Sequence, residues 1–287
     1  MNENEHHLKL TNSEIKEITK ARYSKCAESD VASSCCAVNR SQSSSFATDH
    51  GLYTKEDLSL IPDIALSLSR GCGNPTGFAQ LQPGDIVVDF GCGAGIDVIL
   101  AAKKVVPGGK VIGIDFATEM IQKGKQAVAE AEIEHIVDLF VAELDKINLS
   151  DNIADVVISN CVINLCPDKE AVYREAYRIL KPGGRLAISD VIYTEKIEPQ
   201  IHERFKATWS GCVGGAIEKG LYFNIIKNAG FSEFKIISEH LLASSELTEM
   251  ACCPGAEYTP APAKEDLAYT ENKIESIKFT AIKPHNT

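Results

Sequence analysis

The sequence predicts an α/β protein built on a doubly wound, mostly parallel sheet, and three observations support this. From residue 81 to about 195, short apolar runs alternate with helical segments, a rhythm typical of a parallel sheet with helices on both faces. A glycine-rich stretch, 89–95, joins the first apolar run to the first helical segment. Asp115 follows the second apolar run, twenty residues after the last glycine of that stretch.

The elements of this central part can be assigned one by one. Strands are expected at 85–90, 111–114, 136–141, 154–159 and 185–191. Helices are expected at 96–105, 118–131 and 168–180, with glycine-containing turns at 108–109 and 181–184.

The two ends of the chain have weaker patterns. We expect a helix within 1–20, an irregular serine- and alanine-rich segment at 23–50, helical spacing at 55–70 and a turn at 71–75. Beyond 200, helices are expected at 201–209 and 217–229, and strands at 234–238 and 274–282. These form either the tail of the sheet or a small α+β cap. The predicted organisation is 1–70, an N-terminal segment; 71–197, the sheet domain; and 198–287, a small C-terminal α+β region.

Composition excludes several classes of partner. The 287 residues are 44% hydrophobic, enough for a full core, and the net charge of −11 argues against nucleic acid or an anionic membrane as the main partner. No apolar run approaches the ~20 residues that a membrane span requires. We therefore expect a cytoplasmic protein. Its ten cysteines are then not expected to form a disulfide framework, because cytosolic thiols stay reduced.

The glycine-rich stretch and Asp115 together predict a cofactor site. Glycines allow a tight turn and close approach of the backbone to a ligand, and an acid at the end of the next strand can accept hydrogen bonds from ribose hydroxyls. The spacing is Gly-x-Gly-x-Gly rather than Gly-x-Gly-x-x-Gly, which disfavours the alternative of a nicotinamide dinucleotide.

Three motifs resemble those of S-adenosylmethionine-dependent class I methyltransferases: 88–95, 113–115 and the Leu-Lys-Pro-Gly-Gly of 180–184. The resemblance implies a Rossmann-like methyltransferase sheet, with 143–145 beside the adenine and Asn160 near the methionine part of the cofactor. The cofactor-binding residues that it implies are Asp89, Gly91, Gly93, Gly95, Asp115, Leu144, Asp145 and Asn160.

Three cysteines occupy positions that suit ligands better than core residues. Cys161 follows a predicted strand, Cys72 lies in a Gly-Cys-Gly turn, and Cys212 is flanked by glycines. Substrates of open α/β sheets bind at the carboxyl ends of the strands, so these thiols can form a site for a soft ion. Zinc is disfavoured because the sequence has no Cys-x-x-Cys pair and no His-x-x-x-His pair.

The segments around these thiols closely resemble the arsenite S-adenosylmethionine methyltransferases of the bacterial type. The resemblance rests on 71–75, on 159–165 with the Pro-Asp-Lys of 167–169, and on Trp209, Cys212 and 214–216. It implies that thiols at Cys161 and Cys212 bind trivalent arsenic, and that Cys72 and one N-terminal thiol, either Cys35 or Cys36, complete the reaction cycle.

The implied chemistry suits these residues. Trivalent arsenic prefers thiolates, as soft metals do, and its lone pair can attack a sulfonium methyl without a general base. The substrates would be arsenite and methylarsonous acid, and a thiol reductant such as glutathione or thioredoxin would restore the trivalent state. Two alternatives remain: a methyltransferase for a small organic acceptor, and a non-enzymatic metalloid-binding protein, which the intact glycine-rich stretch disfavours.

Overall fold

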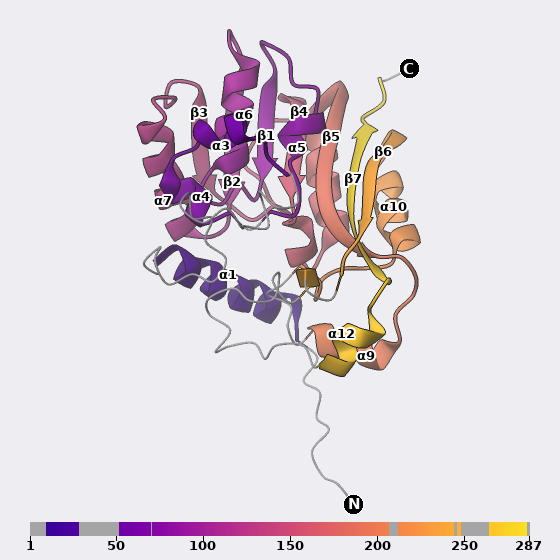
Figure 1. Ribbon diagram of the computed structural model, residues 1–287. Helices are drawn as coiled ribbons and strands as arrows, with labels where there is room; N and C mark the ends of the chain where they lie inside the picture. Colours follow the sequence, from indigo (N-terminus) through magenta and orange to yellow (C-terminus); the bar gives the residue numbers. More distant parts are fainter. Residues whose placement is uncertain are drawn as a thin grey trace, which may run out of the picture.

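The computed structural model describes residues 10–28, 52–69, 71–206, 212–243, 246–247 and 264–285. A seven-stranded sheet with the order β3-β2-β1-β4-β5-β7-β6 forms the centre of this part of the chain (Figure 1). The strands are β1 (Ile86–Phe90), β2 (Lys110–Asp115), β3 (Val137–Val141), β4 (Ala154–Asn160), β5 (Leu180–Tyr193), β6 (Ser232–Leu241) and β7 (Ile274–Ile282).

The pairing of the strands confirms the predicted fold class. Strands β1 to β5 are parallel, whereas β7 runs antiparallel to both β5 and β6. Because β7 inserts between β5 and β6, the C-terminal strands are the tail of the sheet, the first of the two alternatives that the sequence left open.

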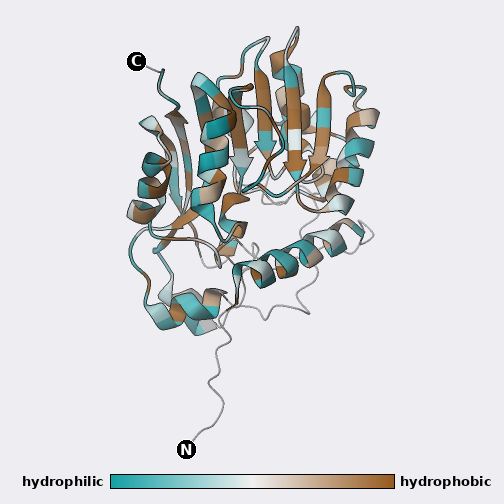
Figure 2. Ribbon diagram, turned by 180° about the vertical axis from the view of Figure 1, so that it is seen from behind, coloured by the Kyte–Doolittle hydropathy of each residue, from teal (hydrophilic) through white to brown (hydrophobic). Residues whose placement is uncertain are grey.

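The helices are α1 (Asn12–Glu28), α3 (Lys55–Ser59), α4 (Asp63–Ser67), α5 (Pro75–Phe78), α6 (Ile96–Val105), α7 (Thr118–Glu130), α8 (Lys169–Ile179), α9 (Pro199–Lys206), α10 (Lys219–Asn228) and α12 (Lys264–Tyr269), with a 3₁₀ turn η2 (Ile163–Leu165). In Figures 1 and 2, α1 crosses the sheet at the end where β1 to β4 terminate. None of the described helices is both long and apolar enough to cross a membrane.

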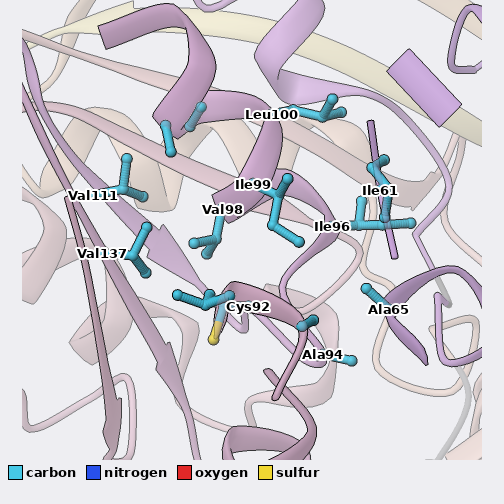
Figure 3. Close-up of a cluster of buried hydrophobic side chains, with 14 of the residues drawn as sticks. Ile61, Ala65, Cys92, Ala94, Ile96, Val98, Ile99, Leu100, Val111 and Val137 are labelled. Atoms are coloured by element: carbon cyan, nitrogen blue, oxygen red, sulfur yellow. The ribbon is translucent and has the colours of Figure 1, made fainter. Parts of the chain in front are cut away.

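The core has two halves, one on each face of the sheet. Successive side chains of a strand point to opposite faces, so Val87 packs with α4, α6 and α7, whereas Val88 packs with α8 and α10. The strands are largely brown in Figure 2, and β1 and β4 are buried at consecutive positions, which is usual for strands covered on both sides. Figure 3 shows the first half, with Val98 close to Cys92 in the loop.

Helix α1 differs from its predicted position. It continues to Glu28 and contains Cys26, which is buried, so the irregular segment does not start at residue 23. The helix begins after Thr11, which shares a capping pattern with Glu14: the Thr11 hydroxyl accepts from the Glu14 N–H, and the Glu14 carboxylate accepts from the Thr11 N–H. This reciprocal pair fixes the start of the helix.

Two other predicted elements are changed for identifiable reasons. The helical spacing of 55–70 forms two short helices, because Pro62 lacks an N–H and disfavours helical geometry in the residue before it. The predicted turn at 181–184 lies inside β5. There Gly183 donates to the carbonyl of Lys283, and Lys283 donates back to Gly184, both at 2.8 Å, so pairing continues across the Pro-Gly-Gly stretch.

Candidate functional site

The glycine loop between β1 and α6 turns sharply at the carboxyl end of the sheet. Gly91, Gly93 and Gly95 have φ angles of 77°, 51° and 97°, in the left-handed region that glycine adopts at little cost. The N–H groups of Gly91 and Cys92 donate to the carbonyl of Ile114, at 2.8 and 2.9 Å, which fixes the loop against β2. A Cβ on Gly93 would meet no atom within 4 Å, so the loop backbone faces open space there.

Asp115 organises this loop from the end of β2. Its carboxylate accepts from the N–H of Gly93 at 3.0 Å and from the N–H of Ala117 at 2.9 Å. Burial raises the pKa of Asp115 to about 6, although these hydrogen bonds act in the opposite direction. The sequence predicted a ribose acceptor at this position. The structure adds a second role, because the same carboxylate holds the glycine loop.

Two more buried carboxyl groups lie beside the loop. Asp89 is the next-to-last residue of β1, two positions before Gly91. Burial, followed by the charges of Asp97 and Asp115, raises its pKa well above the ordinary value. Asp89 is buried and is absent from the described residues that line the cavities beside the loop. Asp97, in the first turn of α6, does line one cavity, and burial raises its pKa to about 6.

Two adjoining cavities lie at this edge of the sheet. The smaller, about 70 Å³, is lined by the glycine loop together with Asp97, Asn160 and Cys161. The larger, about 340 Å³, extends from Asp115 to the segment after β3, where Leu144 and Asp145 line it. Gly91 and Asp115 line both cavities. Of the predicted cofactor residues, all except Asp89 and Gly95 therefore line one continuous region.

Helix α1 covers the larger cavity. Lys16 lies 2.6 Å from the carboxylate of Glu143 and 2.7 Å from that of Asp145. Further along the helix, the hydroxyl of Ser24 donates to Glu119 at 2.5 Å. These contacts connect α1 to the segment after β3 and to the start of α7. The helix is thus part of the site, a role that the sequence did not reveal.

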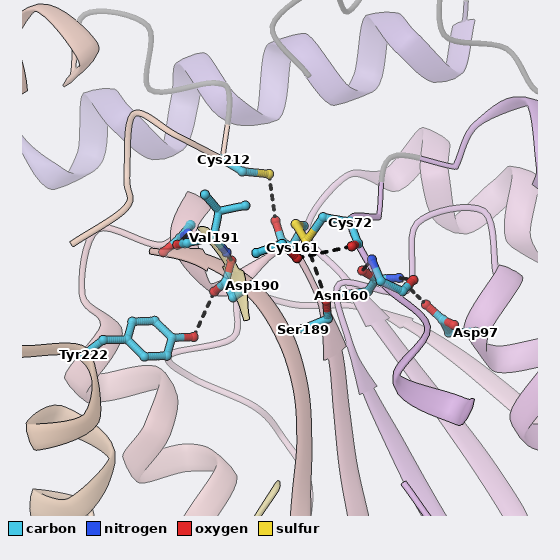
Figure 4. Close-up of a disulfide and its surroundings, with 12 residues drawn as sticks. Cys72, Asp97, Asn160, Cys161, Ser189, Asp190, Val191, Cys212 and Tyr222 are labelled. Carbon is cyan, nitrogen blue, oxygen red and sulfur yellow. Dashed lines mark hydrogen bonds between the residues drawn. A yellow bond between two sulfur atoms is a disulfide. The ribbon is translucent and has the colours of Figure 1, made fainter. Parts of the chain in front are cut away.

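Two of the predicted thiols are joined at this edge. Cys72 and Cys161 form a disulfide with their Cα atoms 5.8 Å apart, and both are buried (Figure 4). Cys161 has a φ of 60°, an uncommon conformation for a residue with a side chain and one that concentrates at functional sites. Its N–H donates to the carbonyl of Ser189 at 2.8 Å, which anchors this turn to β5. Residues 89 positions apart are thereby brought together.

The third predicted thiol lies next to this pair. Cys212 is buried, and its Sγ lies 3.2 Å from the carbonyl oxygen of Cys161, to which it donates a hydrogen bond (Figure 4). The structure therefore brings Cys72, Cys161 and Cys212 together, as the sequence predicted. Cys35 and Cys36 lie outside the described residues, as does Trp209.

Two other free cysteines, Cys92 and Cys166, are arranged differently. Cys92 is buried under the glycine loop, and burial, followed by the charge of Asp115, raises its pKa well above the ordinary value. Burial raises the pKa of Cys166 to about 12, and its Sγ lies 3.8 Å from the carbonyl oxygen of Val162. Both remain protonated thiols at neutral pH, so neither has the thiolate character of a reactive cysteine.

A buried polar network supports the thiol site from below. The carboxylate of Asp190 accepts from the hydroxyl of Tyr222 at 2.9 Å (Figure 4), and Tyr222 accepts from Tyr173 at 2.7 Å. Burial raises the pKa of Asp190 to about 6, against the opposing charge of Lys169. Burial likewise lowers the pKa of Lys169 to about 8. Its ammonium donates to the carbonyls of Asn164 and Cys166, each at 3.3 Å, which fixes the turn after Cys161.

The sequence alone did not indicate a role in the site for several of these residues. Asp97 could have been found, since an acid in the first turn after a glycine loop faces the same side as the loop. Tyr53, whose hydroxyl donates to Asp97 at 3.1 Å, carries no signal in a segment without a period. Lys169 belongs to a Pro-Asp-Lys motif that the sequence indicated, but only the structure shows what its ammonium contacts.

The described residues contain no set of three His, Cys, Asp or Glu side chains arranged to hold a metal ion. Of the three converging cysteines, two share a disulfide, so Cys212 alone of these is a thiol in this state. The arrangement thus suits a substrate that binds after the disulfide is reduced.

The fold and the site define a doubly wound α/β protein with a ligand site at the carboxyl edge of its sheet, and comparison with known proteins identifies the family. Residues 81–230 match the family model described as "Methyltransferase domain". This match covers more than half of the chain, which therefore belongs to the methyltransferase domain family.

Two individual relatives within this family are both arsenite methyltransferases. The chain is 41% identical over 184 residues to the arsenite methyltransferase of Halobacterium salinarum, a match covering 64% of this chain and 46% of that protein. It is 32% identical over 187 residues to the arsenite methyltransferase of Aquipseudomonas alcaligenes, covering 61% and 52%. The chain thus spans about half the length of these curated relatives.

A solved structure has the same fold. It is an arsenic(III) S-adenosylmethionine methyltransferase from Chlamydomonas reinhardtii, with a TM-score of 0.60 and 24% identity. The match covers 81% of this chain and 70% of that one.

Proposed function

We propose that this chain transfers the methyl group of S-adenosylmethionine to trivalent arsenic held by cysteine thiolates, and so detoxifies arsenite. The observation that carries the proposal is the convergence of Cys72, Cys161 and Cys212 beside the cavities at the glycine loop. A methyltransferase for an organic acceptor would need no such group of thiols. The identity to arsenite methyltransferases supports the proposal as well.

The residues around the cavities fit S-adenosylmethionine. The backbone at Gly93 faces open space, the carboxylate of Asp115 is suited to ribose hydroxyls, and Leu144 offers an apolar surface in the larger cavity. When bound, the cofactor supplies an electrophilic methyl on a sulfonium sulfur. Leu144 and Asp145 would hold its adenosine end, and Asp97 and Asn160, in the smaller cavity, would lie near its methionine end.

Cys161 and Cys212 act as the primary arsenic ligands in this proposal. The fixed position of Cys161 at the end of β4 and the hydrogen bond from Cys212 to it keep both sulfurs at one location. Arsenite binding would exchange arsenic–oxygen bonds for arsenic–sulfur bonds and release water. Positioning the arsenic lone pair toward the methyl can by itself lower the barrier by several kcal/mol, so the site needs no general base.

Cys72 has a redox role in the proposal. Methyl transfer formally oxidises arsenic from the trivalent to the pentavalent state. Two electrons must then return to arsenic, and the sulfurs of Cys72 and Cys161 can supply them by closing their disulfide. A dithiol such as thioredoxin, or two glutathione molecules, would reopen that disulfide by thiol exchange. This requirement suits a reducing, cytoplasmic location.

One assay tests the function directly. The chain is incubated with arsenite, S-adenosylmethionine and a thiol reductant, and the arsenicals are separated by chromatography with arsenic-specific detection. We expect methylated arsenicals from arsenite and from methylarsonous acid, and none when the cofactor is omitted. A chain that binds the cofactor by calorimetry but yields no methylated arsenical would contradict the proposal.

A further inference from the structure

Asn160 joins the turn that carries Cys72 to the end of β4 by a second link beside the disulfide. Its carboxamide oxygen accepts from the N–H of Gly73 at 3.0 Å, and its nitrogen donates to the carbonyl of Gly73 at 2.7 Å. Gly73 follows Cys72, and Asn160 precedes Cys161. Two adjacent residue pairs, 72–73 and 160–161, are therefore connected twice: once through sulfur and once through the side-chain amide (Figure 4).

The glycines on both sides of Cys72 make this approach possible. A Cβ on Gly71 would lie 2.2 Å from the amide nitrogen of Asn160, and a Cβ on Gly73 would lie 2.0 Å from the hydroxyl of Ser189. The backbone of the Gly-Cys-Gly turn thus rests directly on polar side chains of β4 and β5. Cys72 is itself 3.7 Å, sulfur to oxygen, from that serine hydroxyl.

The amide of Asn160 is held in place from its other side. Its nitrogen lies 3.0 Å from the carboxylate of Asp97 and 3.1 Å from the hydroxyl of Tyr53. With one N–H directed to Gly73, these two acceptors share the other N–H, and they fix which end of the carboxamide is the donor. The amide is consequently oriented toward Gly73 by residues on α6 and before α3, not by the disulfide.

We propose that Asn160 is a positioning residue that holds the Cys72 turn within bridging distance of Cys161 when the two sulfurs are reduced as well as when they are bonded. Neither hydrogen bond to Gly73 involves a sulfur atom, so reduction of the disulfide leaves both intact. These two hydrogen bonds between Asn160 and Gly73, here called the clamp, therefore set the effective concentration of the Cys72 thiol at the Cys161 thiol. Asn160 would thus position Cys72 and Cys161 for the redox step of the proposed function. Its role in catalysis rests on that proposed function.

The exchange reaction that reports on the clamp is simple. Glutathione disulfide reacts with one protein thiolate, releasing one glutathione and forming a mixed disulfide. The second protein thiolate then attacks the mixed disulfide, releases the second glutathione and closes the Cys72–Cys161 bond. Two electrons pass from the protein to glutathione disulfide, and each glutathione takes up one proton. The clamp acts on the second, intramolecular step.

The test compares Asn160→Ala with wild type in buffers of defined glutathione ratio, without arsenic and without cofactor. Peptide mass spectrometry after alkylation measures the Cys72–Cys161 disulfide, the dithiol and the mixed disulfide. Loss of two ordinary hydrogen bonds should lower the equilibrium constant for disulfide formation roughly tenfold, which corresponds to about 30 mV for a two-electron couple. The mixed disulfide, scarce in wild type, should accumulate.

Asn74→Ala is the matched control, because it removes the same side chain from the same turn. Asn74 caps α5 by accepting from Gly77 and, among the described residues, has no side-chain bond to β4. In this variant the equilibrium constant for forming the Cys72–Cys161 disulfide should stay within twofold of the wild-type value. Gly71→Ala provides a second perturbation: it keeps residue Asn160 but places a Cβ 2.2 Å from its amide nitrogen, which must displace the amide. The disulfide equilibrium should shift in the same direction as in Asn160→Ala.

Two results would overturn the proposal: an Asn160→Ala equilibrium within twofold of wild type, or an equal shift in Asn74→Ala. If Asn160→Ala does not fold, Gly71→Ala decides, and an unchanged equilibrium there counts against the clamp. Because no arsenic or cofactor is present, the result is independent of whether the chain methylates arsenic.

Discussion

The Sγ of Cys212 donates a hydrogen bond to the backbone carbonyl of Cys161, 3.2 Å away, while the Sγ of Cys161 is bonded to that of Cys72. A segment from beyond β5 and a turn from before β1 thus meet at Cys161, the residue that follows β4. Reduction of the disulfide would present three sulfur atoms at one location, next to the cavities of the glycine loop. This relationship determines which substitutions should be damaging.

Replacement of either arsenic ligand should abolish methylation. Cys161→Ser and Cys212→Ser exchange a soft sulfur donor for a hard oxygen of nearly the same size, so arsenite binding should be lost while the fold and cofactor affinity persist. Methylation assays with arsenite, together with calorimetric titration of the cofactor, measure both properties.

Cys166→Ser is the matched control for these two variants. Its thiol contacts the carbonyl of Val162, and a hydroxyl can replace it there, so arsenite methylation should be retained. Full activity of Cys161→Ser or Cys212→Ser on arsenite would remove that residue from the proposed site.

Asp115→Ala should weaken cofactor binding. The variant loses the acceptor for the ribose and the contact that holds Gly93, and the loss of a hydrogen bond to a charged group costs roughly 1.5–3 kcal/mol. Because the pKa of Asp115 is raised to about 6 by burial, wild-type affinity should increase as pH rises from 5 to 7 and the carboxyl ionises. Calorimetric titrations across this range provide the measurement.

In the same titrations, Asp115→Asn separates the contribution of the Asp115 charge to cofactor affinity from the contribution of its side-chain shape. The amide keeps the size of the side chain but cannot ionise, so its cofactor affinity should be low and nearly independent of pH. An affinity that equals the wild-type value at pH 7 would show that the carboxylate does not bind the ribose.

Local motifs made the sheet and the cofactor edge predictable. The glycine loop, Asp115 and the alternation of strands and helices are properties of short segments, and the structure reproduces them. The start of α1 was also encoded locally, in the Thr11 and Glu14 capping pair, but was overlooked. The disulfide between Cys72 and Cys161 was not predictable, because nothing in either segment specifies a partner 89 residues away.

The supporting residues of the site were hidden for the same reason. Tyr53 acquires its role only because tertiary packing brings its hydroxyl to Asp97 and Asn160. Asp190 lies within an apolar run, where the sequence pattern gave no reason to expect an ionisable network. The sequence could thus indicate which residues meet the ligand, whereas the residues that position them depend on long-range contacts.

The buried carboxyl of Asp190 should make stability depend on pH. Its pKa in the folded chain is about 6, above the ordinary 3.8, so between these values the folded chain binds more protons than the unfolded chain. The free energy of unfolding should therefore fall as pH rises from about 4 to 6. At ~1.4 kcal/mol per pKa unit, this one group accounts for at most roughly 3 kcal/mol.

Asp190→Asn isolates this contribution. The variant lacks the ionisable group, so its stability relative to wild type should increase as pH rises from 4 to 7, whatever the constant cost of the changed hydrogen bonds. Urea unfolding at several pH values gives the two curves. A difference between them that does not vary with pH would mean that Asp190 ionises normally in the folded chain.

Lys16 should control the rate at which the cofactor leaves. Its ammonium bridges from α1 to Glu143 and Asp145 at the larger cavity. The three side chains are partly exposed, so the pairs should add only ~0–1 kcal/mol to stability, and Lys16→Ala should unfold at nearly the wild-type urea concentration. Because the same pairs connect α1 to the far wall of the cavity, cofactor release should nevertheless become a few-fold faster, as measured by stopped-flow displacement with an excess of unlabelled cofactor.

Lys110→Ala is the matched control for this effect. It removes a comparable exposed pair, Lys110 to Asp138 at 2.5 Å, from the opposite end of β2, and it should leave the release rate unchanged. Salt gives an independent check, since screening weakens exposed pairs: raising the ionic strength should accelerate release from the wild type and have little effect on Lys16→Ala. Equal release rates for wild type and Lys16→Ala at low salt would mean that α1 does not limit cofactor exit through these ion pairs.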